Sequence, residues 1–314
     1  MRRTSHILGA ALVGVALPAL LVGLMIGEFA AYALVAGVLL GGVGAKLGGA
    51  RRMLVLTPAM GLAAGLGALT AYDWWWAALL ATAGVLTGAG IGFGWLAPLL
   101  MVPYAATFVS PASSARNALI YGVVVAIGTL YGIVIARRFG APEVADGQHL
   151  PLPVASVVAV VSGAVLGGAA AIGVALGWTE PYWVPEPVLI LALYIVIGKR
   201  DRIRGKAIGT SIGVAAAIPV ALLDPPAWVL TTVGVVVFVL ALTQAEKYWL
   251  MYGLYTFSLV LLLSAPGQVG AEATERGFQI LVGVGLLVVG LIVMHALGAW
   301  LSKRHPQPEL ALES

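Results

Sequence analysis

Long apolar stretches separated by short polar breaks run through almost the whole chain. A helix that crosses a membrane needs ~20 apolar residues to span a ~30 Å hydrocarbon core, and most of these stretches approach that length. The sequence predicts twelve helices, at residues 7–26, 29–45, 53–71, 74–92, 94–109, 116–136, 153–176, 182–198, 206–223, 227–243, 247–264 and 276–300. The predicted fold class is therefore all-α, a polytopic membrane protein of about 12 transmembrane helices.

Composition supports the same class. Of the 314 residues, 61% are hydrophobic and 10% are charged, whereas a soluble domain carries roughly 25% charged residues. The chain has no cysteine, which excludes disulfides and cysteine-based metal sites, and we expect no metal and no other cofactor. The first apolar run lasts to Ile26 and continues almost directly into the next, so we interpret it as a membrane helix rather than a cleaved signal.

The basic residues follow the predicted topology. If the N-terminus is cytoplasmic, 15 of the 17 face the cytoplasm and two, Arg116 and Arg276, lie outside. The fifteen are Arg2, Arg3, Lys46, Arg51, Arg52, Arg137, Arg138, Lys199, Arg200, Arg202, Arg204, Lys206, Lys247, Lys303 and Arg304. This bias predicts an inner (plasma) membrane protein with both termini cytoplasmic, and it explains the pI of 9.4 without nucleic-acid binding.

The two halves of the chain also resemble each other. Residues of the same type recur at an offset of 151 to 160 in the pairs Glu28 and Glu180, Arg52 and Arg204, Gly61 and Gly213, Asp73 and Asp224, Trp76 and Trp228, Trp95 and Trp249, and Arg116 and Arg276. Their common order predicts two six-helix repeats, 1–138 and 153–314, joined by a cytoplasmic linker at 139–152. Because six is even, both repeats would enter the membrane from the same side and be parallel.

One stretch carries a family resemblance. Tyr182 and Trp183 precede an apolar helix, a basic loop and the run RGKAIGTSIG from Arg204 to Gly213, and ERGFQILVG follows from Glu275. These features resemble the fusaric acid resistance family, the aromatic acid exporters related to plant aluminium-activated malate channels. Longer members carry a large cytoplasmic domain that this sequence lacks. The resemblance implies export of small organic anions, typically aromatic carboxylates.

The two exterior arginines are candidates for binding the anion. Arg116 and Arg276 each fall at the predicted start of a helix, where the positive end of the helix dipole disfavours a guanidinium by ~0.3–1 kcal/mol. An anion between the arginine and the free N–H groups would reverse that penalty. The alternative is that Glu275 neutralises Arg276 and that Arg116 extends into water.

Further candidates lie at other helix starts. Arg52, Arg204 and Lys206 could concentrate anions at a cytoplasmic mouth, although the positive-inside bias also explains their positions. Thr210 and Gln279 could offer neutral hydrogen bonds along a path, or bond within and between helices instead.

Three classes of function remain to be compared. A membrane enzyme is disfavoured because the sequence has no acidic metal motif and no HExxH. A transporter of small organic anions is favoured, and the absence of a carboxylate at the middle of any predicted helix favours movement driven by the membrane potential over proton antiport. The alternative is a non-transporting membrane subunit or scaffold of a larger complex. Expected partners are membrane lipid and the anion, with no nucleic acid, and a homo-oligomer is left open.

Overall fold

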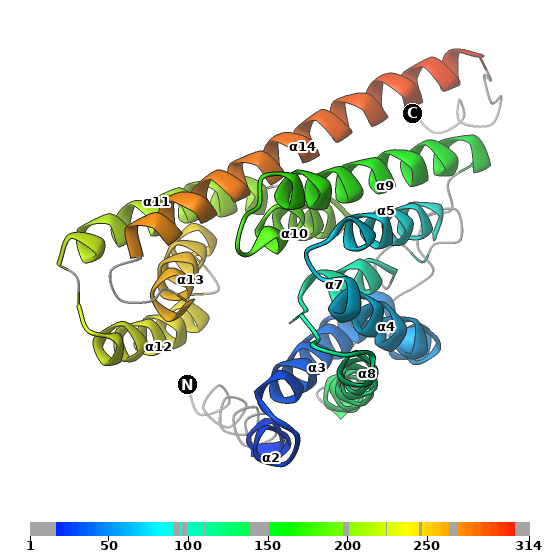
Figure 1. Cartoon of the computed structure of the whole chain (residues 1–314). Helices are drawn as coiled ribbons and strands as arrows, with labels where there is room; N and C mark the ends of the chain where they lie inside the picture. The colour runs from blue at the N-terminus through cyan, green and yellow to red at the C-terminus, as the bar shows by residue number, and fades with distance from the viewer. Residues whose placement is uncertain are drawn as a thin grey trace. The chain divides into compact units, whose positions relative to one another are not determined.

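The computed structural model describes residues 17–90, 95, 99–109, 111–138, 151–196, 201–223, 225–244, 247–263 and 269–304. Every regular element among these residues is a helix, which confirms the all-α prediction (Figure 1). Helices suit a bilayer because they satisfy their own backbone hydrogen bonds where water is absent. Within the described residues five helices are long and apolar enough to cross a membrane, and the chain is a helical membrane protein.

The helices follow the predicted order closely. In chain order they are α2 (Leu17–Ile26), α3 (Glu28–Gly48), α4 (Ala50–Thr70), α5 (Trp74–Ala89), α7 (Met101–Thr107), α8 (Ala115–Arg138), α9 (Leu152–Ala175), η3 (Pro181–Trp183), α10 (Pro185–Val196), α11 (Asp201–Leu223), α12 (Ala227–Thr243), α13 (Tyr248–Leu263) and α14 (Val269–Arg304). The start of the predicted helix 7–26, most of the stretch before α7 and nearly all of the linker 139–152 lie outside the described residues.

Two boundaries differ from the prediction for identifiable reasons. The predicted helix 182–198 divides into η3 and α10, and Pro185 begins α10 because proline lacks the N–H that a first helical turn leaves unpaired. The predicted helix 276–300 begins earlier, at Val269. Val269 and Ala273 are buried in a core, so packing extends this helix through residues that look polar on average.

The structure divides into two compact units. The first unit comprises residues up to Leu189 together with those from Leu286 onward, and the second comprises Ile190–Gly285. This division follows packing and differs from the division by sequence repeat. The repeats and their boundaries stay predictions.

In the first unit, glycines let helix backbones touch. A Cβ added at Gly37 of α3 would lie 3.0 Å from the Cα of Gly128 in α8, and one at Gly42 would lie 3.7 Å from the carbonyl oxygen of Gly132. Residue numbers rise together along this contact, so α3 and α8 run parallel. In contrast, α4 runs antiparallel to α8, and α5 to α9, as Figure 1 shows for the latter pair. Helices that cross a membrane one after another alternate in direction, and the directions of these three pairs agree with the predicted order of crossings.

A buried tryptophan joins three helices of the first unit. Asp73 caps α5 by accepting hydrogen bonds from the backbone N–H groups of Trp75 (2.7 Å) and Trp76 (3.1 Å). The cap orients Trp76, which is fully buried and whose Nε1 donates to the carbonyl oxygen of Ala106 in α7 at 2.9 Å. Trp76 thereby packs α5 against α7, and Ala63 of α4 belongs to the same core cluster.

The second unit is built on a parallel pair of helices, α11 and α13. A Cβ added at Gly209 would lie 2.9 Å from the backbone nitrogen of Gly253, and one at Gly213 would collide with the carbonyl oxygen of Gly253. Earlier in α11, a Cβ at Gly205 would lie 2.9 Å from the ring of Tyr248. Glycine at every fourth position therefore gives α11 a smooth face on which the backbone of α13 lies.

We expect Trp76→Phe to destabilise the protein. The ring remains, but the carbonyl oxygen of Ala106 loses its donor in a buried position, which costs about 1–3 kcal/mol of unfolding free energy. Trp75→Phe is the matched control, because Trp75 is 75% exposed and its indole is outside the core. Thermal unfolding in detergent, followed by circular dichroism, should show a lower midpoint for the first variant alone. Equal midpoints would contradict this role for Trp76.

We expect Gly213→Ala to separate α11 from α13. The new methyl group would meet the Gly253 carbonyl and lie 2.9 Å from the Cβ of Thr256, and such overpacking costs about 1–3 kcal/mol. Gly285→Ala in α14 is the control, since no atom lies within 4 Å of its added Cβ, and alanine favours the helix by up to ~1 kcal/mol. Thermal unfolding should show a lower midpoint for Gly213→Ala than for Gly285→Ala. A lower midpoint for Gly285→Ala would show that the close crossing is absent.

Candidate functional site

Buried polar side chains gather in the second unit, on α11, α13 and α14. They are Lys206, Thr210, Thr256, Ser258, Arg276 and Gln279. Four of them, Lys206, Thr210, Arg276 and Gln279, are candidates predicted from the sequence. Burying a charge within a membrane protein is costly, so buried cations there indicate a functional role by default.

Arg276 is 2% exposed and contacts the end of a neighbouring helix. Its Nη1 donates to the carbonyl oxygen of Leu259 at 2.8 Å, near the C-terminus of α13. The sequence predicts Arg276 at the start of its own helix, and this prediction is wrong because α14 begins about two turns earlier, at Val269. The relevant dipole is instead the negative C-terminal end of α13, which stabilises the guanidinium.

Gln279 lies one turn beyond Arg276 and is fully buried. Its Nε2 donates to Oε1 of Glu275 at 2.8 Å. Its own carbonyl oxygen is buried and accepts no hydrogen bond from the described residues. An unsatisfied buried acceptor costs about 1–3 kcal/mol, so this oxygen is a natural position for a donor supplied by a ligand or by water.

Lys206 is 3% exposed and lies against an aromatic row. Its Nζ is 5.0 Å from the centroid of the Tyr252 ring, within the range of a cation–π contact. Tyr252 in turn packs against Tyr248 at 4.8 Å and against Tyr255 at 6.0 Å between ring centroids. The cation and the tyrosine rings therefore form one continuous surface.

The two buried cations contact one side of α13. Tyr252, beneath Lys206, and Leu259, the acceptor for Arg276, are seven residues apart, which is close to two full turns and ~10 Å along the helix. Tyr255 and Thr256 lie between them at the intermediate turn. Two cations separated by two helical turns, with a tyrosine and a threonine between, form the candidate site.

The remaining predicted residues have other surroundings. Arg204 is at the start of α11 and is exposed. Arg52 belongs to the first unit, is half-buried and has its guanidinium carbon 5.7 Å from the centroid of the Trp95 ring. Arg116 also belongs to the first unit, where it is exposed in the first turn of α8. The predicted repeats pair Arg116 with Arg276, but the two residues differ in burial.

Sequence reasoning missed the tyrosine row and Thr256. Tyr248, Tyr252 and Tyr255 recur at spacings of four and three, the pattern of residues on one helix face. That spacing was available in the sequence. What the sequence lacked was the identity of the facing residue, because Lys206 comes from a different helix.

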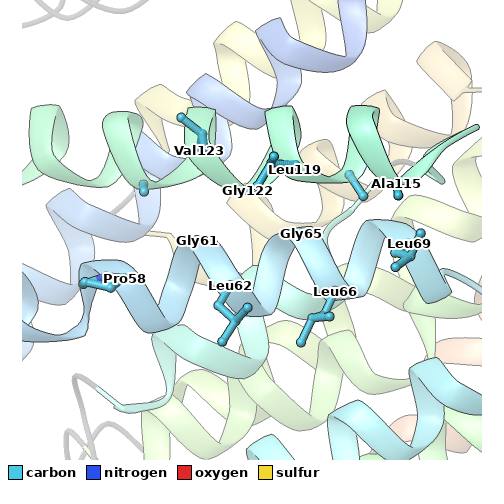
Figure 2. A pocket seen from close by; sticks show the side chains of 12 residues that line it. Pro58, Gly61, Leu62, Gly65, Leu66, Leu69, Ala115, Leu119, Gly122 and Val123 are labelled. Atoms are coloured by element: carbon cyan, nitrogen blue, oxygen red, sulfur yellow. The ribbon is translucent and has the colours of Figure 1, made fainter.

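Other features of the described residues do not form an ionic site. The cavity drawn in Figure 2, of about 410 Å³, lies between α4 and α8 in the first unit and is lined by apolar residues and glycines. No cluster of three or more His, Cys, Asp or Glu suited to a metal occurs within the described ranges.

In the loop before α5, burial and the nearby Glu180 carboxylate raise the pKa of Tyr72, so this hydroxyl stays neutral.

Part of the chain is similar to a known protein family. No curated protein and no solved structure matches the chain. The family model for fusaric acid resistance protein-like proteins matches residues 168–293, a range that contains α11, α13 and the buried cations of α11 and α14. The resemblance predicted from the sequence is thereby confirmed over these residues, and the match indicates a membrane transport or resistance role.

Proposed function

We propose that the protein exports small organic anions, of the aromatic carboxylate class, across the bacterial inner membrane. The observation that carries the proposal is the pair of buried cations, Lys206 and Arg276, on one side of α13. Both lie within the segment that matches the family. Glu275, one residue before Arg276, is half-buried, and its carboxylate accepts a hydrogen bond from Gln279.

The chemistry of the site suits this class of substrate. A carboxylate matches the planar fork of a guanidinium and also pairs with an ammonium group. The ring of the same molecule packs against Tyr252 or Tyr255, as aromatic pairs do at centroid distances of 4.5–7 Å. A hydroxyl on the substrate, or a bridging water, donates to the free carbonyl oxygen of Gln279.

The membrane potential drives the export in this proposal. An anion that leaves a negative cytosol gains ~2.3 kcal/mol per charge for each 100 mV. On the predicted cytoplasmic side, the exposed Arg204 lies two residues before Lys206 and concentrates anions at the entrance. No proton-carrying carboxylate at mid-membrane is then required.

Helix packing gives partial support to the duplicated bundle. In the first unit α7 packs against α4 and α5, and in the second α13 packs against α11 and α12, which are the corresponding helices of the proposed repeats. The predicted correspondence of Gly61 with Gly213 has weaker support. Gly61 of α4 packs against Gly122 of α8, whereas Gly213 of α11 packs against Gly253 of α13. We propose the repeats on the helix pairs rather than on the glycines.

We expect Arg276→Gln to lower flux of a labelled aromatic carboxylate from proteoliposomes under an imposed potential. Losing one charged hydrogen bond to the anion corresponds to about 1.5–3 kcal/mol, or roughly 10- to 150-fold in affinity. Arg276→Lys retains the charge but not the fork and should be intermediate. Arg138→Gln removes an exposed charge at the end of α8 and should leave the flux unchanged.

The outcomes separate the alternatives. Flux that is equal in wild type and Arg276→Gln, with both proteins folded by circular dichroism, would remove Arg276 from the mechanism. No potential-dependent flux from the wild-type protein would favour the non-transporting subunit or scaffold.

A further inference from the structure

The apolar cavity of the first unit is an open groove along the crossing of α4 and α8. Gly61 and Gly65 of α4 face Gly122 of α8 across the groove, as Figure 2 shows. A Cβ added at Gly61 would lie 2.9 Å from the carbonyl oxygen of Gly122, so the backbones nearly touch at the floor. The walls are leucines that point outward, among them Leu62 at 65% and Leu119 at 67% exposure.

The length of the groove matches one leaflet of a bilayer. Its lining runs from Pro58 to Leu69 on α4 and from Ala115 to Ala126 on α8. Eleven residue steps on each helix correspond to ~16 Å, about half of a ~30 Å hydrocarbon core. A transmembrane helix from another protein would need a groove of about twice this length. An acyl chain of a single lipid fits.

One end of the groove has the exposed tryptophans that are typical of a membrane surface. There α4 ends at Thr70 and α5 begins at Trp74. Trp74 and Trp75 are 62% and 75% exposed, as tryptophans of an interfacial belt are. Since α8 runs antiparallel to α4, the N-terminal end of α8 lies at the same level, and Ala115 lines the groove there.

Arg116 is placed beside that end. It follows Ala115 directly and is exposed, and no hydrogen bond or ion pair joins it to the part of the chain that the structure describes. Ser114 already caps the helix, because its hydroxyl accepts from the backbone N–H of Asn117 at 3.2 Å. The guanidinium is therefore available to a group outside the protein, and the dipole of α8 disfavours it unless an anion is near.

We propose that this groove binds one anionic phospholipid. Its acyl chain lies on the glycine floor between the leucine walls, and its phosphate receives hydrogen bonds from the guanidinium of Arg116. Charge complementarity selects an anionic headgroup over a zwitterionic one. The lipid also explains a cation on the side of the membrane where the positive-inside bias predicts none.

The test uses photoreactive lipids with the full chain in phosphatidylethanolamine vesicles. A small fraction of the lipid carries a diazirine on its acyl chain and is either phosphatidylglycerol or phosphatidylethanolamine. After irradiation, mass spectrometry of peptides measures labelling of the groove walls at Leu62, Leu66 and Leu119. We expect the anionic probe to label these residues roughly fivefold more than the zwitterionic probe, the size of one arginine contact at a membrane surface.

Two variants make the test specific. Arg116→Gln should reduce the anionic preference to near one while the groove is still labelled. Arg138→Gln removes an exposed charge at the opposite end of α8 and should preserve the preference. Equal labelling of the wild type by both probes, or a preference that survives Arg116→Gln, would overturn the proposal. Cross-links from the groove walls to a second copy of the chain, in place of lipid, would do the same.

Discussion

The candidate site depends on the close approach of two helix backbones. Gly209 and Gly213 of α11 have no side chain where the backbone of α13 passes at Gly253. This contact holds the two helices parallel and in a fixed register, and it brings Lys206, one turn before Gly209, over the ring of Tyr252. A larger residue at either glycine would separate the cation from the tyrosines.

Both buried cations contact groups that carry partial negative charge. The ring of Tyr252 faces Lys206, and a backbone carbonyl at the C-terminal end of α13 accepts from Arg276. The face of an aromatic ring and the carbonyl end of a helix each stabilise a nearby cation. In the proposed function these cations attract an anion, and the intervening tyrosine adds a surface for an aromatic ring. This combination supports the proposed export of aromatic carboxylates.

Much of the fold could be predicted from apolar patterning. The predicted helix 227–243 has the bounds of α12, and 153–176 differs from α9 by one residue at each end. Patterning failed where polar residues lie within a helix. Glu272 and Glu275 made the start of α14 look like a loop, although Val269 and Ala273 on the same segment are buried.

The site was only partly accessible from sequence. The residue types of Lys206, Thr210, Arg276 and Gln279 were sufficient to make them candidates, but spacing could not give their environment. The predicted repeats pair Arg116 with Arg276, yet one is exposed and the other is buried, because burial depends on which helices pack against each residue. The tyrosine row was visible as a helix face but had no partner until α11 and α13 were paired.

Ligand-induced stabilisation tests the central claim most directly. Purified protein would be heated in detergent with benzoate or with benzamide, which keeps the ring but carries no charge. If Lys206 and Arg276 hold a carboxylate, benzoate at ~100 times its dissociation constant stabilises the folded state by about 2.7 kcal/mol, whereas benzamide does not stabilise it. The substitution Lys206→Met then reduces the stabilisation by benzoate. Equal stabilisation by both compounds, or by neither at saturating concentration, would contradict an anion site between these two cations.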